Sequence, residues 1–226
     1  MRAAPMSCAG LLVALLAAPH QIAAAQTTQV ESRAEIANPL FYDWSSLGPV
    51  FTFLPSPFTA LVGSSLSMTV SSATGDGLEL SEQGEFFPGG FADGTALLWT
   101  GLPSGPLTFS FSRAISGFGA DAQSNFSGAF TGTIRAFGST NNLLGTFMNS
   151  GVGPSPESGG QVAFLGVRST EGIFAVEIAT EDNDFLMNGL TIGMMEQVSV
   201  VPEPATMALF ATGLAGLGFV SRRRRA

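Results

Sequence analysis

Residues 107–112 read Leu-Thr-Phe-Ser-Phe-Ser, and residues 174–179 read Phe-Ala-Val-Glu-Ile-Ala. In both stretches large apolar side chains alternate with smaller or polar ones, which is the period of a β-strand with one buried face. No helical period of useful length occurs between Gln26 and Val201. Short segments of this kind, separated by clusters of Gly, Pro, Asn and Ser, predict an all-β fold, a sandwich or a barrel.

Nineteen Phe against one Tyr and two Trp fit a thick core between two sheets. The same composition fits poorly with a sugar-stacking surface, which usually presents Trp and Tyr. We expect one β-sandwich domain over residues 38–199, preceded by a flexible polar arm over residues 26–37. The Pro- and Gly-rich residues 151–160 indicate a surface loop, with a domain boundary as the alternative. Further strands are expected at residues 49–54, 66–71, 96–100, 126–137, 161–168 and 186–192.

The residue types in the middle of the chain exclude several kinds of chemistry. All nine cationic residues are Arg, and the single histidine and single cysteine, His20 and Cys8, lie within the first 25 residues. A product without those residues has no Ser-His-Asp or Cys-His nucleophile, no His or Cys zinc ligand, no disulfide and no lysine for a Schiff base or P-loop. Its chemistry rests on carboxylates, hydroxyls, amides and arginine.

Residues 1–25 have the three parts of a secretory signal peptide. Arg2 gives the positive start, residues 8–18 are apolar, and the alanines at 23–25 offer a cleavage site before Gln26. The apolar run would rise only about 16 Å as a helix, too short for a hydrocarbon core of about 30 Å. We therefore expect export and cleavage; the alternative is a buried N-terminal helix.

The C-terminal residues 200–226 contain three elements in order, and the first is Pro202-Glu203-Pro204. Each proline fixes its own φ and lacks an N–H, so this tripeptide presents extended backbone and joins neither a sheet nor a helix interior. Pro204 suits the first turn of a following helix, and Glu203 suits the positive end of its dipole.

The second and third elements are an uncharged stretch over residues 205–220 and an arginine cluster. The uncharged stretch would be about 24 Å long as a helix, and we expect it to be a single transmembrane helix. Each arginine would cost about 2.5–3.5 kcal/mol at the bilayer centre, so the cluster stops transfer and stays cytoplasmic. The alternative is a buried C-terminal helix with a basic tail. The cluster consists of Arg222, Arg223, Arg224 and Arg225.

These three elements together resemble the PEP-CTERM sorting signal of exported bacterial proteins. The resemblance implies that a membrane-embedded exosortase recognises Pro202, Glu203 and Pro204 and processes the tail after transient residence in the inner membrane. It also implies a final place at the cell surface or in the extracellular matrix of a bacterium that makes polysaccharide and biofilm. These residues would then be the substrate of another enzyme.

Parts of the body resemble the jelly-roll-like domain often found ahead of this signal. Residues 115–121, Ile-Ser-Gly-Phe-Gly-Ala-Asp, resemble its Gly-Phe-Gly-Ala turn, and residues 164–167, 174–178 and 184–190 resemble its closing strand pair. The resemblance implies a jelly-roll-like antiparallel β-sandwich. The family pattern commonly has Asp where Asn188 stands.

Two groups of acidic residues are candidates for chemistry. Residues 181–184, Glu-Asp-Asn-Asp, form an oxygen-rich turn in which Asp182 and Asp184 are candidate Ca²⁺ ligands, with Asp121 or Asn188 nearby; the alternative is a solvated acidic turn. The second group would suit glycoside hydrolysis if two carboxylates faced each other, and otherwise forms a solubilising face. It consists of Asp76, Glu79, Glu82 and Glu85.

Two further observations bear on partners. Asn125-Phe126-Ser127 fits the N-glycosylation sequon. Residues 26–201 carry sixteen acidic residues and four arginines, a formal charge of −12, which argues against nucleic acid as a partner. We expect a non-catalytic exported β-sandwich, structural or associated with extracellular polysaccharide. The alternatives are an extracellular carbohydrate-active enzyme with an Asp/Glu pair, or a single-pass membrane protein whose tail is never cut.

Overall fold

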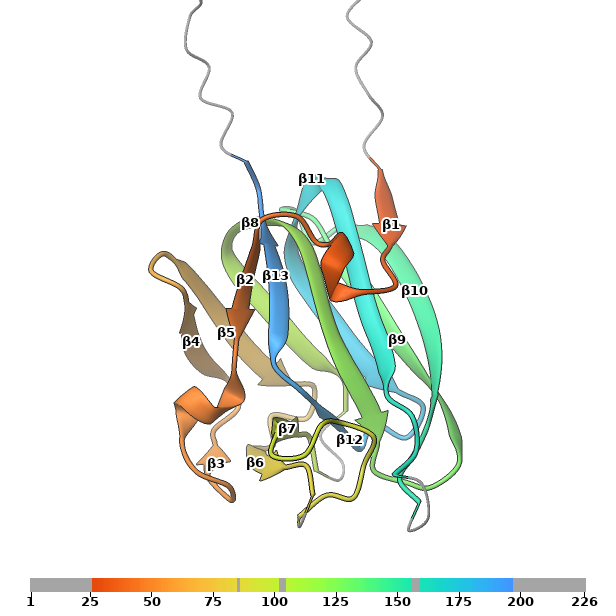
Figure 1. The fold of residues 1–226 in the computed structure, drawn as a ribbon. Helices are drawn as coiled ribbons and strands as arrows, with labels where there is room; N and C mark the ends of the chain where they lie inside the picture. The colour runs from red at the N-terminus through yellow and green to blue at the C-terminus, as the bar shows by residue number, and fades with distance from the viewer. Residues whose placement is uncertain (1–25, 85, 102–104, 156–158, 197–226) are drawn as a thin grey trace, which may run out of the picture.

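A computed structural model of the chain describes residues 26–84, 86–101, 105–155 and 159–196 (Figure 1). The strands of these residues pair antiparallel throughout, so the prediction of an all-β antiparallel fold is confirmed, and the arrangement fits a β-sandwich. The strands are β1 Thr27–Gln29, β2 Pro39–Tyr42, β3 Phe53–Leu54, β4 Phe58–Val62, β5 Leu66–Ser72, β6 Leu78–Glu82, β7 Ala96–Trp99, β8 Leu107–Ser124, β9 Ala129–Phe137, β10 Leu143–Val152, β11 Ala163–Thr180, β12 Phe185–Met187 and β13 Leu190–Met194, with two 3₁₀ helices, η1 Arg33–Glu35 and η2 Trp44–Leu47.

Two 18-residue strands, β8 and β11, run through both layers of the sandwich. The first half of β8 pairs with β5 and with the second half of β11, whereas its second half pairs with β13 and with the first half of β11. The rings of Phe109 and Phe118 have centroids 5.2 Å apart. Nine residues of straight strand would extend about 30 Å, so β8 bends sharply and its two halves fill one core.

The bend in β11 coincides with an irregular stretch of its pairing with β8. The register shifts between Arg168 and Ile173, and it shifts again between Ile173 and Ala175. Gly172 lies within the first of these shifts and has a φ of +92°. This left-handed conformation is open to glycine at no steric cost. A bulge of this kind adds local twist and lets one strand pass from the first layer to the second.

The core between the layers is built from the alternating residues that the sequence predicted. Leu107, Phe109 and Phe111 of β8 are buried, together with Val176 and Ile178 of β11. Burial of each such side chain contributes about 1.5–3 kcal/mol. The large count of phenylalanine is thus used partly in this core.

The N-terminal segment, residues 26–37, differs from the flexible arm that the sequence suggested. Its β1 pairs with β11, its Val30 N donates to Gly166 O over 3.1 Å, and Val30 and Ile36 are buried. The segment lies across the outer face of the second layer (Figure 1). The polar composition of the segment did not predict this docking. It depends on only two apolar side chains, Val30 and Ile36, and on the backbone pairing of β1 with β11.

Glycines in the strands below make room for this segment. A Cβ on Gly119 would lie 2.9 Å from Ile36 Cδ1, and a Cβ on Gly193 would lie 2.8 Å from Ile36 Cγ2. Residues 115–121, which we expected to form a turn, are therefore part of β8. Their glycines serve close packing and not chain reversal.

Several predicted strands have different bounds in the structure. The strand expected at residues 49–54 is reduced to the two residues of β3, and the segments 161–168 and 174–178 belong to one strand, β11. The stretch 186–192 is divided between β12 and β13. Strands β1, β2, β4, β6 and β10 were not predicted.

The first two residues of the stretch 151–160 still belong to β10, and the connection to β11 follows them; β8 and β9, which precede this stretch, pair with β11, as a loop within one domain requires. Both the start of β1 and the end of β13 lie at the upper end of the sandwich in Figure 1, whereas β3, β6, β7 and β12 lie at the lower end. None of the helices in the described ranges has the length and apolarity needed to cross a membrane. The signal peptide and the helix expected at 205–220 lie outside these ranges.

Replacement of Ile36 by alanine tests whether the N-terminal segment is part of the folded unit. Ile36 is 3% exposed, and truncation of a buried isoleucine costs about 2–5 kcal/mol of the free energy of unfolding. We expect Ile36→Ala to lower the urea midpoint, whereas the control Leu61→Ala, at a residue 68% exposed, leaves it nearly unchanged. Equal midpoints for the two variants would contradict the docking.

Candidate functional site

The sorting residues predicted from sequence lie outside the described part of the chain. This applies to Pro202, Glu203 and Pro204 and to the arginines at 222–225. The structure thus leaves their predicted roles untested. The other candidate residues lie at the lower end of the sandwich or on its outer face.

Glu79 and Glu82 of β6 are not arranged as a catalytic pair. Glu79 and Glu82 are three residues apart on one strand, so their side chains point to opposite faces. Leu78 and Leu80 face the core together with Glu82, and Glu79 faces the other side. Asp76 lies in the exposed turn before β6, and Glu85 is outside the described residues. Glycoside hydrolysis requires two carboxyl groups across one bond, which Glu79 and Glu82 do not provide.

The acidic turn at 181–184 is held by hydrogen bonds within the chain. Asp182 accepts from Ser124 Oγ and from Thr180 Oγ1, at 2.5 and 2.7 Å. Asp184 accepts from Trp99 Nε1 at 2.6 Å and from Asn125 Nδ2 at 3.0 Å, and it is 1% exposed. Each of the four carboxylate oxygens therefore has a donor, and the turn anchors Trp99 and the sequon residue Asn125.

No group of three or more His, Cys, Asp or Glu side chains able to hold a metal occurs among the described residues. Asp121 and Asn188, the further ligands considered from sequence, bond to each other and to Arg33. The Ca²⁺ site at Asp182 and Asp184 stays a prediction, which thermal unfolding with Ca²⁺ and with a chelator tests.

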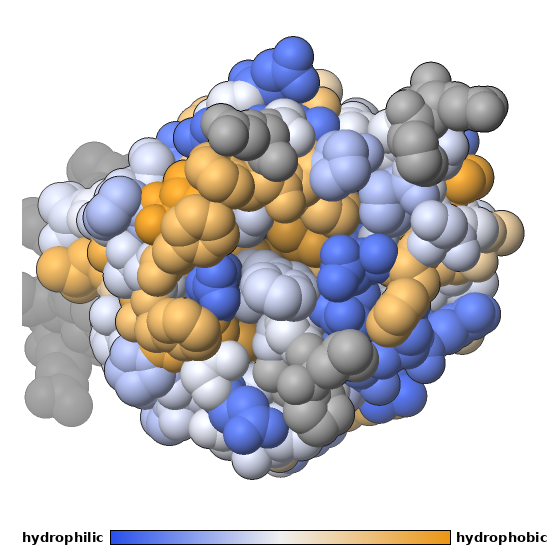
Figure 2. Space-filling view, turned by 90° about the horizontal axis from the view of Figure 1, so that it is seen from below, coloured by the Kyte–Doolittle hydropathy of each residue, from blue (hydrophilic) through white to orange (hydrophobic). Residues whose placement is uncertain are grey.

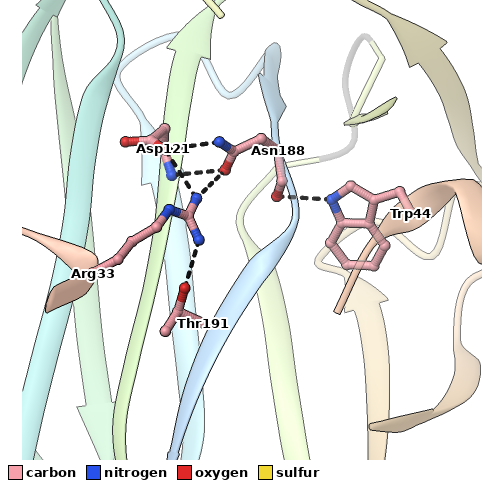
Figure 3. Close-up of polar contacts among 5 residues, drawn as sticks. All are labelled: Arg33, Trp44, Asp121, Asn188 and Thr191. Atoms are coloured by element: carbon pink, nitrogen blue, oxygen red, sulfur yellow. Dashed lines mark hydrogen bonds and ion pairs between the residues drawn. The ribbon is translucent and has the colours of Figure 1, made fainter. Parts of the chain in front are cut away.

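The polar cluster around Arg33 was not predicted from sequence (Figure 3). Arg33 Nη2 donates to Asp121 Oδ2 over 2.9 Å and to Asn188 Oδ1, and Nη1 donates to Thr191 Oγ1 over 2.7 Å. Asn188 Nδ2 donates to the same Asp121 oxygen over 2.7 Å, and Asn188 O accepts from Trp44 Nε1. These bonds fasten the N-terminal segment to β8 and β13. Because these bonds join residues of the protein to one another, they indicate a structural cluster.

A small pocket lies at the lower end of the sandwich, and we call it the end pocket. Its volume is about 130 Å³, and Figure 2 views this end, where hydrophobic side chains border a hollow that hydrophilic ones also reach. Aromatic rings, one carboxylate, one hydroxyl and one amide gather there. The lining residues are Phe51, Glu79, Ser81, Phe86, Phe87, Trp99, Asn125 and Leu186.

The end pocket lies on the outer face of a short-stranded extension of the sheet. Glu79 of β6 stands opposite Trp99 of β7, and Trp99 stands opposite Leu186 of β12. Residues directly opposite in antiparallel strands share a face, so these side chains form one row. Leu186 also packs with Phe87 and Leu97 in a small hydrophobic cluster, and Trp99 is packed against this cluster.

Two larger hollows, of about 320 and 430 Å³, border the N-terminal segment. Their long polar side chains are already bonded within the protein: Arg168 to Thr28, and Arg33 and Asn188 in the cluster described above. By contrast, no hydrogen bond or ion pair joins the carboxylate of Glu79 to any of the described residues. The end pocket is therefore the candidate binding site.

Sequence reasoning named Glu79 and Asn125 but not the aromatic residues that surround them. Phe51, Phe86 and Trp99 are far apart in the sequence, and the strands expected at residues 49–54 and 96–100 did not indicate that these three side chains meet at one site. One signal was available: large aromatic residues next to Pro and Gly often lie at exposed turns, where a core role is difficult.

Comparison with known proteins identifies the C-terminal motif. Residues 200–225 match the family model described as PEP-CTERM protein-sorting motif. The chain matches no curated protein.

Three solved structures are similar in fold. A DUF4465 family protein from Bacteroides caccae has 8% identity and a TM-score of 0.44, over 70% of this chain and 100% of its own. A family 6 carbohydrate-binding module has 12% identity and a TM-score of 0.33, over 66% and 100%. The K1 cleaved adhesin domain of Lys-gingipain from Porphyromonas gingivalis has 14% identity and a TM-score of 0.36, over 64% and 99%. At these identities the likeness is one of fold alone, and no function follows from it.

Replacement of Asn188 by aspartate tests the Arg33 cluster. The variant loses the Nδ2 donor and places a second carboxylate against Asp121 Oδ2, which now lies 2.7 Å from that donor. We expect a loss of about 1–3 kcal/mol in the free energy of unfolding at neutral pH. The loss should shrink at acidic pH, because protonation of one carboxyl restores a donor and removes the repulsion. Asn141→Asp, in an exposed turn, is the matched control.

Urea unfolding of both variants at neutral and acidic pH measures these differences. A neutral-pH loss that is the same for Asn188→Asp and Asn141→Asp would show that the Asn188 amide does not hold the cluster.

Proposed function

We propose that this chain is an exported bacterial protein that an exosortase processes and leaves at the cell surface or in the extracellular matrix. The single observation that carries the proposal is the match of residues 200–225 to the PEP-CTERM protein-sorting motif. The signal peptide predicted over residues 1–25 supplies the export that such processing requires.

We propose further that the β-sandwich body is non-catalytic and serves a structural or glycan-associated role. Two observations support this. The body lacks His, Cys and Lys, and β6 separates Glu79 from Glu82 onto opposite faces. The charge of −12 over residues 26–201 suits a body that stays clear of nucleic acid and anionic lipid.

The position of the chain ends suits a tethered body. Both ends of the described sandwich lie at its upper end, so the points at which the preceding and following segments are attached share one side (Figure 1). The end pocket lies at the opposite side. A body attached through its tail would thus present the end pocket away from its point of attachment.

Intact mass of the protein from its own host tests the processing. We expect the mature form to lack residues 1–25 and roughly two dozen C-terminal residues, including the arginines at 222–225. A variant with Ala at Pro202, Glu203 and Pro204 should keep the whole tail and stay with the inner membrane. Pro154→Ala, in a surface loop, should be processed like the wild type.

A soluble mature form that still carries Arg222 to Arg225 would contradict the processing. A membrane-bound form with an uncut tail in the wild type would favour the alternative of a stable single-pass membrane protein. Reduced polysaccharide turnover in Glu79→Gln or Glu82→Gln would favour the enzyme.

A further inference from the structure

We infer that the end pocket binds one uncharged sugar ring of an extracellular polysaccharide. The inference rests on the proposed function for the source of the ligand, but the site itself is argued from its own residues. Three features carry it: a strained aromatic residue, a fixed indole ring and a carboxylate without a protein partner.

The strained residue is Phe51, whose φ is +66°. This region is uncommon for any residue other than glycine, and for a bulky side chain it costs about 1–3 kcal/mol. The conformation is held by a hydrogen bond from Phe51 N to Leu80 O, 2.7 Å long. Such strain persists where the surrounding structure enforces it, and it is concentrated at functional sites.

The strained backbone presents the Phe51 ring at the mouth of the pocket. The ring is in edge-to-face contact with Phe86, with centroids 4.8 Å apart, and the two residues are 57% and 44% exposed. An edge-to-face pair held at the surface leaves apolar area in water that a ligand can cover. The apolar C–H face of a sugar ring is a ligand that can cover such area and still leave its hydroxyls hydrated.

Trp99 forms a second, more rigid wall. Its Nε1 donates to the buried carboxylate of Asp184 over 2.6 Å, and the same carboxylate accepts from Asn125. The indole ring therefore keeps one orientation before a ligand arrives. A ring fixed in advance loses little conformational entropy on binding, which favours affinity.

Glu79 supplies the polar part of the site. Its carboxylate stands beside Trp99 in the row across β6 and β7, and it has no hydrogen bond or ion pair to the described residues. An ionised carboxylate only accepts hydrogen bonds, so it seeks donors such as sugar hydroxyls. The hydroxyl of Ser81 lines the same face.

Charge and size narrow the ligand to one uncharged ring. Glu79 and the body charge of −12 would repel a uronate or a sulfated sugar. A volume of about 130 Å³ is less than half of the roughly 300 Å³ at which pockets for drug-sized ligands begin. One ring gives weak affinity, which many copies on a matrix polymer would raise through avidity.

The experiment is a binding panel with the protein as isolated from its own host, in a detergent whose headgroup is not a sugar. The probes are soluble glucan, xylan, mannan and galactan, with alginate as the anionic comparison. Binding is measured by intrinsic fluorescence, because Trp99 lines the pocket and the other tryptophan, Trp44, is fully buried elsewhere. We expect at least one uncharged polysaccharide to bind and alginate not to bind.

Three variants test the residues that line the end pocket: Trp99→Ala, Phe51→Ala and Glu79→Gln. Because Trp99→Ala removes the fluorescent side chain, binding by this variant is measured by affinity electrophoresis. Each should weaken binding at least about tenfold. Glu82→Gln is the matched control, because Glu82 lies on the same strand but on its other face, and Phe41→Ala removes an exposed ring outside the pocket. Glu79→Gln changes no packing atom, so it remains informative if Trp99→Ala does not fold.

Failure of all four uncharged polysaccharides to bind would overturn the inference. So would preferential binding of alginate, or equal loss of affinity in Glu79→Gln and Glu82→Gln. These outcomes leave the sorting proposal intact, since the binding assay does not depend on where the tail is cut. In turn, an uncut tail in the mass experiment would not alter the affinities.

Discussion

The bend in β8 is the constraint on which the remaining structure depends. Because Phe109 and Phe118 of one strand meet across the core, both layers of the sandwich are tied through a single segment of backbone. β11 follows β8 through the same bend, with its bulge around Gly172. The other strands attach to these two directly or through one neighbour, except β6 and β3, which follow β12 and β7 at the lower end. Without disulfides in the body, this shared core has to supply the stability of the exported protein.

The same bend explains how much of the fold the sequence could predict. Alternation in residues 107–112 and 174–179 correctly gave strands and a buried face, because period two is a local property. The bend itself depends on contacts between halves of a strand, so no window of sequence contains it. The Gly-Phe-Gly-Ala stretch illustrates the problem. Its resemblance to a family motif suggested a turn, whereas its glycines allow Ile36 to approach β8 closely.

The site was partly predictable for a related reason. The sequence pointed to Glu79 through its charge and to Asn125 through a sequon, but it assigned them to different purposes. What brings them together is the pairing of β6 with β7 and the bonds of Asp184 to Trp99 and Asn125, which are long-range. The abundance of phenylalanine counted against a sugar-stacking surface, and that argument treated all aromatic residues as core. Phe51 is 57% exposed and Phe86 is 44% exposed, because both lie in connections and not in the long strands.

The two ends of the sandwich have different physical tasks. At the upper end the N-terminal segment is fastened by Ile36 and by the hydrogen bonds of Arg33, which fix the place where the chain enters the fold. At the lower end the carboxylate of Glu79 has no hydrogen bond or ion pair to the described residues, and Phe51 is held in a costly backbone conformation. A strained residue contributes nothing to stability where it stands, so the core between the ends has to offset it. Because that core is continuous through β8 and β11, the end pocket can be rigid without being stabilising. A single ring makes few contacts with a small, half-exposed site. Binding there is therefore favoured when the side chains of the site are already fixed and lose little conformational entropy.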